Sequence, residues 1–208
     1  MIKAIIFDMD GVLADTDKAR FLVLQELLGK REIVLEKKYY KRSIGARTKE
    51  FLKELFEELI SDTEIDDIYK ELRAKPKVIE EQPHAASCCE RLSKNFILAI
   101  GSGSQEDQIH LVLKTLGIDQ CFSKIVGSNK IKRHKPDPET YLECLKALEL
   151  EGKQCLAVED SPRGVASAKG AGCFCVGVSY THTKDELSQA DMVISDLEHL
   201  TEDIISKI

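Results

Sequence analysis

The sequence lacks the two common marks of a membrane or exported protein. No window approaches the ~18–20 consecutive apolar residues that a membrane-spanning helix needs. The first residues show no basic segment followed by an apolar stretch and a small-residue cleavage site, so we expect no secretion signal. A cytoplasmic location is therefore the default expectation.

Paired cysteines are also missing. The seven cysteines are an odd number, form no C-x-x-C motif and have no histidines at matching spacing. We therefore expect reduced thiols buried in the core, with no redox or metal role.

Positive charge is not in excess. The net charge of −6 argues against nucleic acid or an anionic membrane as the main partner. The run NKIKRHK, residues 129–135, has a second interpretation as a small nucleic-acid patch, although such runs are common on solvated faces. We expect a monomer that acts on a small molecule and binds neither nucleic acid nor membranes.

Two kinds of pattern divide the chain. Residues 17–74 are almost wholly helical in pattern, with Gly29 closing one helix and Thr63 with Asp66 as a capping box that opens another. From His84 onward, short apolar runs alternate with helical segments, which is typical of a mostly parallel, doubly wound sheet. The expected strands are Ala4–Phe7, Phe96–Ile100, Ile125–Val126, Cys155–Val158, Cys173–Val178 and Met192–Ile194, and the expected helices cover 105–116, 138–148, 162–170 and 197–207.

The expected fold class follows from this alternation. The first strand must join the later ones, because a lone strand is not stable. We therefore predict an α/β protein with a Rossmann-like core formed by residues 1–14 and 82–208. An inserted all-helical domain, residues 15–81, interrupts this core.

Acidic residues follow the first strand. Asp8 and Asp10 come directly after its apolar run, and Gly11 begins a turn. In open α/β sheets, ligands bind just beyond the carboxyl ends of the strands. These two carboxylates are therefore the first candidates for chemistry.

The second predicted strand leads into Gly-Ser-Gly-Ser, residues 101–104. Free backbone N–H groups and the helix dipole at such a turn favour an anion. From its position at the strand end we expect Ser102 to be functional, whereas Ser104, with Asp107 three residues on, is expected to cap the next helix.

A lysine and two acids follow later in the chain. Lys135 precedes a proline-bounded helix start and is a candidate fixed cation for a phosphate, the alternative being a solvated surface charge. Glu159 and Asp160 end another strand and would make the pocket heavily anionic unless a cation sits there. An all-oxygen donor set beside phosphate points to Mg²⁺. Alternatively, Asp160 caps the helix that follows.

Taken together, four motifs carry a family resemblance. In chain order they resemble those of the haloacid dehalogenase superfamily of phosphotransferases, and they are Asp8-x-Asp10-Gly-Val, Ser102, Lys135 in HKPDP, and Glu159-Asp160-Ser161. The helical insertion resembles the small cap of that superfamily. The details FDMDGVLADT, HKPDPE and EDSPRGV look most like its β-phosphoglucomutase-like branch.

The resemblance implies a role for each residue. Asp8 would be the nucleophile that forms an aspartyl-phosphate, and Asp10 the general acid and base. Ser102 and Lys135 would bind the transferring phosphoryl oxygens. The implied Mg²⁺ ligands are Asp8, the backbone carbonyl of Asp10, Asp160 and Glu159.

The implied activity is a Mg²⁺-dependent phosphatase acting on a small phosphorylated metabolite, with a sugar phosphate as the expected class. A sugar-phosphate mutase is the alternative. A dehalogenase is disfavoured, because breaking a carbon–halogen bond needs no proton from Asp10. A receiver-like signalling module combines similar residues, but its phospho-accepting Asp follows a middle strand.

The helical insertion is expected to select the substrate. Arg47 stands beside Gly45 in the loop SIGART, and permissive loops often carry binding residues. At position 20 the chain has Arg where the mutases of this branch usually have histidine, and Thr16 could support Asp10 at the hinge. The candidate substrate-binding residues are Thr16, Arg20, Gly45, Arg47 and Gly103.

Overall fold

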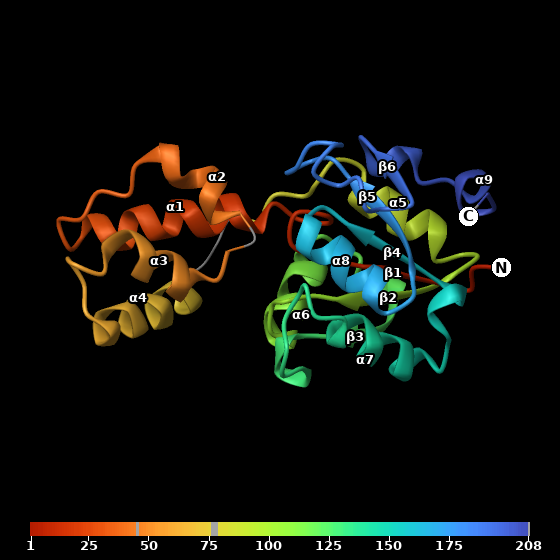
Figure 1. Ribbon diagram of the computed structural model, residues 1–208, viewed down its shortest axis with the longest axis horizontal. Coiled ribbons are helices and arrows are strands. Elements are labelled where there is room, and N and C mark those ends of the chain that lie inside the picture. Colours follow the sequence, from red (N-terminus) through yellow and green to blue (C-terminus); the bar gives the residue numbers. More distant parts are fainter. Residues whose placement is uncertain (45, 76–78, 208) are drawn as a thin grey trace. The chain divides into compact units, whose positions relative to one another are not determined.

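The computed structural model describes residues 1–44, 46–75 and 79–207, and the chain forms two compact units (Figure 1). The core unit consists of Met1–Ala14 and Glu81–Ile208, and the helical unit of Asp15–Glu80. In the described ranges, no helix combines the length and the apolar character needed to span a membrane.

A six-stranded parallel sheet forms the centre of the core unit. Its order is β3-β2-β1-β4-β5-β6, so the direction of strand addition reverses between β1 and β4. This confirms the predicted Rossmann-like class. The topological switch point lies at the neighbouring strands β1 and β4, and in such sheets ligands bind just beyond the carboxyl ends of the strands at this point. The strands are β1 (Ala4–Phe7), β2 (Ile97–Gly101), β3 (Phe122–Val126), β4 (Cys155–Glu159), β5 (Phe174–Val178) and β6 (Met192–Ile194).

Helices connect these parallel strands. The right-handedness of such connections places α5 (Ala85–Leu92) and α6 (Glu106–Thr115) on one face, and α7 (Glu139–Leu148) and α8 (Pro162–Gly170) on the other. Every residue of β1 and β4 is buried, because helices cover both faces. This explains why these strands are continuous apolar runs and do not alternate in polarity.

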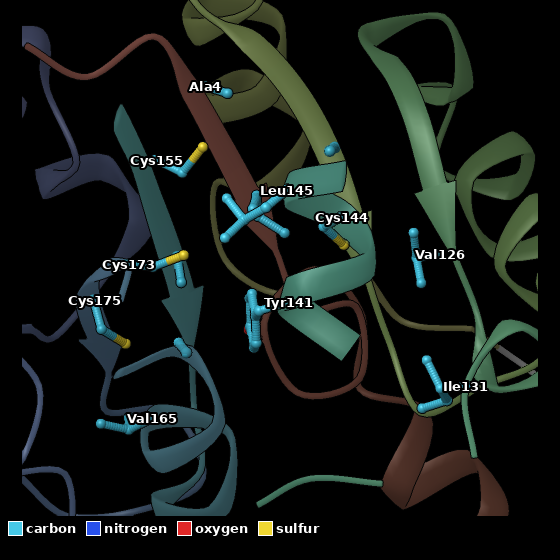
Figure 2. Packing of buried hydrophobic residues seen from close by; sticks show 14 of the residues in the cluster. Ala4, Val126, Ile131, Tyr141, Cys144, Leu145, Cys155, Val165, Cys173 and Cys175 are labelled. Atoms are coloured by element: carbon cyan, nitrogen blue, oxygen red, sulfur yellow. The ribbon is translucent and has the colours of Figure 1, made fainter. Parts of the chain in front are cut away.

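One apolar cluster lies between the sheet and helices α7 and α8 (Figure 2). Tyr141, Cys144 and Leu145 point into it from α7, and Val165 does so from α8. The cluster also holds Cys155, Cys173 and Cys175, and all seven cysteines of the chain are free thiols. Burial raises the pKa of the Cys144 thiol to about 12 and that of Cys155 to about 11, which makes both poor nucleophiles.

The helical unit has a core of its own. Phe21, Leu24, Leu27 and Leu28 form the buried face of its first helix and pack against apolar residues of the third and fourth. Among the described residues of this unit none forms a strand, as expected from the sequence. Its helices are α1 (Thr16–Gly29), α2 (Tyr40–Ser43), α3 (Thr48–Phe56) and α4 (Asp62–Ala74).

Two local predictions need correction, and one helix was missed. The capping box of α4 is formed by Ser61 and Glu64, not by Thr63 and Asp66, because Ser61 has the extended backbone that a cap requires. Residues 197–207 do not form one helix: a 3₁₀ turn, Leu197–His199, is separated from α9 (Glu202–Ile205) by a break at Leu200. Helix α5 was not predicted.

Candidate active site

Three carboxylates meet at the switch point. Asp8 directly follows β1, and its backbone N–H donates to the carbonyl of Val158 in β4 at 2.9 Å. Glu159 is the last residue of β4, and Asp160 comes next. Asp8, Glu159 and Asp160 are all buried, and each offers an oxygen within 4.8 Å of the others. The strand ends therefore gather negative charge in a place that water hardly reaches.

Lys135 balances part of this charge. Its Nζ donates to Oδ1 of Asp8 at 2.9 Å, to Oε1 of Glu159 at 2.5 Å and to the carbonyl of Gly101 at 3.0 Å. All three ammonium protons are therefore used. The interpretation of Lys135 as a solvated surface charge is wrong, since only 13% of its side chain is exposed.

Tyr141 and Arg163 were not singled out in the sequence, yet both contact this group. The Tyr141 hydroxyl donates to Oε1 of Glu159 at 2.7 Å, and the Lys135 Nζ lies 5.1 Å from the centre of its ring. The Arg163 guanidinium donates twice to the backbone carbonyl of Lys135, at 3.2 and 2.6 Å. No sequence motif described above includes Tyr141, whereas Arg163 lies within the segment EDSPRGV.

The pKa values reflect burial and charge together. Burial raises the pKa of Asp8 to about 8; Lys135 acts against this rise, while Glu159 and Asp10 add to it. Burial works against the charge of Lys135, but the carboxylates of Asp8 and Glu159 outweigh it and hold the pKa of Lys135 above its ordinary value. Lys135 is therefore a fixed cation at neutral pH.

Asp10 has different surroundings from Asp8. The hydroxyls of Ser102 and Ser104 both donate to its Oδ2, at 2.9 and 2.8 Å. The prediction that Ser104 caps α6 is wrong: Gln105 occupies the cap position, without a side-chain capping hydrogen bond, and the Ser104 hydroxyl is turned toward Asp10. Ser102 is completely buried and is held by its backbone N–H, which donates to the carbonyl of Val126 at 3.1 Å.

The alternative prediction for Asp160, that it caps the following helix, is wrong. The cap of α8 is Ser161, whose hydroxyl accepts from the backbone N–H of Gly164 at 3.1 Å. The hydroxyl of Thr181 donates to Oδ2 of Asp160. Thr181 was missed in the sequence, although its position beyond β5, at the same edge of the sheet, is a signal that could have found it.

Two glycines give the carboxylates room. A Cβ on Gly11, whose φ is +83°, would lie 2.0 Å from Oδ2 of Asp160. A Cβ on Gly164 would lie 2.0 Å from the carboxyl carbon of Glu159. The carboxylates can occupy these positions only because both neighbours lack a side chain.

The residues fit a hard divalent cation. The donor set consists of carboxylate oxygens, and one ammonium group cannot neutralise three carboxylates. Asp8, Glu159 and Asp160 could hold such an ion together, although Oε1 of Glu159 also accepts from both Lys135 and Tyr141.

Of the other candidates, Thr16, Arg20 and Arg47 belong to the helical unit and Gly103 to the core unit. Arg20 pairs with Asp17 and donates to the carbonyl of Ser43 within the helical unit. Thr16 begins α1, Arg47 precedes α3 and pairs with Glu50 at 2.9 Å, Gly103 is exposed in the turn after Ser102, and Gly45 lies outside the described residues. In the basic run, Lys130 pairs with Glu106 at 2.7 Å and Arg133 with Glu139 at 3.0 Å.

Comparison with known proteins shows the family of the chain. The model of the haloacid dehalogenase-like hydrolase family matches residues 5–178. The chain belongs to this family. The flavodoxin-like strand order 2-1-3-4-5, which receiver-type modules share, also differs from the order found here.

Relatives place this haloacid dehalogenase-like hydrolase in the β-phosphoglucomutase-like branch. It is 29% identical to a phosphorylated carbohydrates phosphatase of Thermotoga maritima, over 82% of each chain. It is 27% identical to the β-phosphoglucomutase of Bacillus subtilis, over 98% of this chain and 94% of the relative. The crystal structure of a β-phosphoglucomutase from Clostridium difficile has a TM-score of 0.82 and 26% identity, covering 100% of this chain and 96% of that one.

Proposed function

We propose that this protein is a Mg²⁺-dependent phosphatase that hydrolyses a small phosphorylated metabolite, of the sugar-phosphate class, through a phosphoryl group carried on Asp8. That the chain is a phosphoric monoester hydrolase follows from its family and from the phosphatase among its relatives. The observation that carries the proposal is the meeting of Asp8, Lys135 and the Asp10–serine group at the switch point.

In the first step, a carboxylate oxygen of Asp8 attacks phosphorus, and the bond from phosphorus to the ester oxygen breaks. The leaving oxygen takes a proton from Asp10, so the departing metabolite carries a hydroxyl group. Lys135 supplies positive charge for the phosphoryl oxygens, and Ser102 would supply a hydroxyl donor once its O–H turns from Asp10 to the bound phosphoryl group. The position of Lys135 against Oδ1 of Asp8 supports this assignment.

In the second step, Asp10 takes a proton from water, and the water oxygen attacks phosphorus. The bond from Asp8 to phosphorus breaks, inorganic phosphate leaves, and the Asp8 carboxylate is restored. Asp10 suits proton transfer because it is more accessible than the buried Asp8 and is oriented by two hydroxyls.

Mg²⁺ would be held by Asp8, Asp160 and the backbone carbonyl of Asp10, with Glu159 assisting. When bound, it neutralises the negative charge that separates an anionic nucleophile from an anionic substrate. The hydroxyl of Thr181 orients the Asp160 carboxylate for this purpose.

The helical unit is proposed to be the cap that selects the substrate. It has its own apolar core, so it can act as a body separate from the sheet. Arg47 is the candidate in this unit for contact with the substrate, because its guanidinium is exposed and can bind an anionic group. Its ion pair with Glu50, at 2.9 Å, is also exposed, and such pairs are weak enough to be exchanged for a ligand.

A mutase is the second candidate, favoured by the likeness to β-phosphoglucomutases. Arg20 argues against it, because the mutases that the chain resembles usually have histidine at this position. A conversion assay from glucose 1-phosphate to glucose 6-phosphate separates the two candidates, since a phosphatase releases inorganic phosphate from both.

The proposal is tested by measuring phosphate release from a panel of phosphorylated metabolites, with Mg²⁺ and with EDTA. We expect multiple turnovers with Mg²⁺ only. Asp8→Asn should lower kcat by at least about a thousandfold without unfolding the protein, because the amide cannot attack phosphorus. Asp119→Asn, an exposed control outside the site, should behave like the wild type. Substantial turnover by Asp8→Asn would overturn the assignment of the nucleophile.

A further inference from the structure

Tyr141 is a buried polar group that the proposed reaction does not use. Its side chain is completely buried, and it points from α7 into the apolar cluster beneath the sheet (Figure 2). A phenylalanine would fill the same space without placing a hydroxyl in this cluster. A hydroxyl buried in apolar surroundings costs free energy unless it is hydrogen-bonded, and the bond to Glu159 satisfies this one.

The bond ends on the same oxygen that holds the catalytic lysine. Oε1 of Glu159 accepts from the Tyr141 hydroxyl at 2.7 Å and from the Lys135 Nζ at 2.5 Å. Two donors from different elements fix the rotation of a carboxylate more firmly than one does. Gly164, which has no side chain, leaves the space that this carboxylate occupies.

Lys135 in turn depends on where Glu159 is held. Its ammonium group lies between Oε1 of Glu159 and Oδ1 of Asp8, with the carbonyl of Gly101 as third acceptor. If the carboxylate of Glu159 rotated, the Lys135 ammonium would shift toward whichever carboxylate, Asp8 or Glu159, attracted it more strongly. The charge that faces the phosphoryl group would then move.

We propose that Tyr141 is a positioning residue for phosphoryl transfer, which acts through Glu159 to hold the Lys135 ammonium beside Asp8. This inference rests on the proposed function of Lys135. A displacement of about 1 Å of such a group is enough to cost a large factor in rate. Tyr141 itself does not touch the substrate.

The test compares Tyr141→Phe with a matched loss of a tyrosine hydroxyl elsewhere in the core unit. The Tyr180 hydroxyl donates to the carbonyl of Pro83 at 2.7 Å and accepts from the backbone N–H of Leu197 at 2.9 Å, so Tyr180→Phe also removes hydrogen bonds within the fold. We expect Tyr141→Phe to lower kcat by about tenfold while KM changes by less than about twofold. Tyr180→Phe should keep the wild-type kcat. An unchanged kcat in Tyr141→Phe, with only a lower melting temperature, would reduce Tyr141 to a structural role and overturn the proposal.

A second readout needs no turnover and therefore separates this inference from the proposed function. In metal-free protein labelled with ¹⁵N-lysine, a held ammonium gives a slowly exchanging ¹H–¹⁵N signal, which is assigned to Lys135 by its loss in Lys135→Arg. We expect this signal in the wild type and in Tyr180→Phe, and its shift or disappearance in Tyr141→Phe. Absence of the signal from the wild type, or an identical signal in Tyr141→Phe, contradicts the inference. If no substrate is turned over but the signal responds as expected, the proposed function fails, and only the statement that Tyr141 holds the Lys135 ammonium through Glu159 stands.

Discussion

Two aspartates that are two residues apart have different surroundings. Asp8 is buried against the ammonium group of Lys135, whereas Asp10 is half-buried and accepts from two serine hydroxyls. Burial raises the pKa of Asp8 and the Lys135 ammonium acts against this rise, while the two neutral hydroxyls orient the Asp10 carboxylate without supplying a full charge. The proposed division of labour between attack and proton transfer therefore has a structural basis at each residue.

Ser104 gives the first prediction at this scale. Ser104→Ala removes one of the two hydroxyls that orient Asp10, and we expect kcat to fall about five- to tenfold for alkyl phosphates. The loss should be much smaller for p-nitrophenyl phosphate, because its leaving group needs little protonation. Steady-state assays on both esters measure this difference.

Ser123→Ala is the matched control, since its hydroxyl bonds to the carbonyl of Leu98 at 3.0 Å and not to Asp10. It should leave both rates unchanged. An equal loss on both esters in Ser104→Ala would mean that Ser104 does not act through the proton donor.

The raised pKa of Asp8 predicts how stability depends on pH without metal. The folded chain keeps the Asp8 proton up to about pH 8, whereas the unfolded chain releases it near the ordinary value of 3.8. Between these limits folding takes up a proton, so this contribution to the free energy of unfolding is present below about pH 4 and is lost as pH rises through 8. Asp8→Asn removes the dependence.

Urea unfolding in EDTA, at several pH values between about 4 and 9, measures this effect. The stability of the wild type relative to Asp8→Asn should fall as pH rises through this window. Parallel pH profiles of the two proteins would show that Asp8 is already ionised in the folded, metal-free state.

At the scale of elements, the start of α4 shows that capping-box spacing alone does not determine which residue caps a helix. The chain contains Ser61 with Glu64 and Thr63 with Asp66, and both pairs have capping-box spacing. Only Ser61 has the extended backbone of a cap, and only there do the reciprocal bonds form. The start of α8 was easier to predict, because proline is favoured at the first position of a helix, where a backbone N–H would have no partner within the helix.

This distinction gives a prediction for the helical unit. Ser61→Ala should lower the free energy of unfolding by about 1 kcal/mol, because the backbone N–H of Glu64 loses its acceptor. Thr63→Ala, two residues further into the helix, should change it by less than about 0.5 kcal/mol. Chemical unfolding followed by circular dichroism measures both free energies. Equal losses in the two variants would contradict the assignment of Ser61 as the cap and favour Thr63.

The candidate site was partly predictable for the same kind of reason. Asp8, Glu159 and Asp160 could be found because parallel strands bring their carboxyl ends to one edge, so short apolar runs point to them. The bond from Tyr141 to Glu159 could not be found, because it depends on how α7 packs on the sheet. The Ser104 bond depends likewise on the course of one turn.

At the scale of the whole molecule, the chain leaves the core unit and returns to it at one place. Ala14 and Glu81 form an antiparallel bridge, and the backbone N–H of Gln82 donates to the carbonyl of Leu13 at 3.0 Å. The segment between them, Asp15–Glu80, has its own apolar core. Because its ends lie side by side, this segment can be exchanged for a short linker without pulling the sheet apart.

This geometry yields the last prediction. A chain in which a short Gly/Ser linker replaces residues 15–80 should fold, because the sheet, its helices and the clustered residues of the candidate site all belong to the core unit. If the helical unit selects the substrate and excludes water, kcat/KM for the preferred metabolite should fall by at least about a hundredfold, while p-nitrophenyl phosphate loses much less. Near-ultraviolet circular dichroism checks the fold, and rates on the two esters measure discrimination. A shortened protein that folds and still prefers the same metabolite would place substrate selection in the core unit, among residues such as Gly103 and Arg163 at the edge of the sheet.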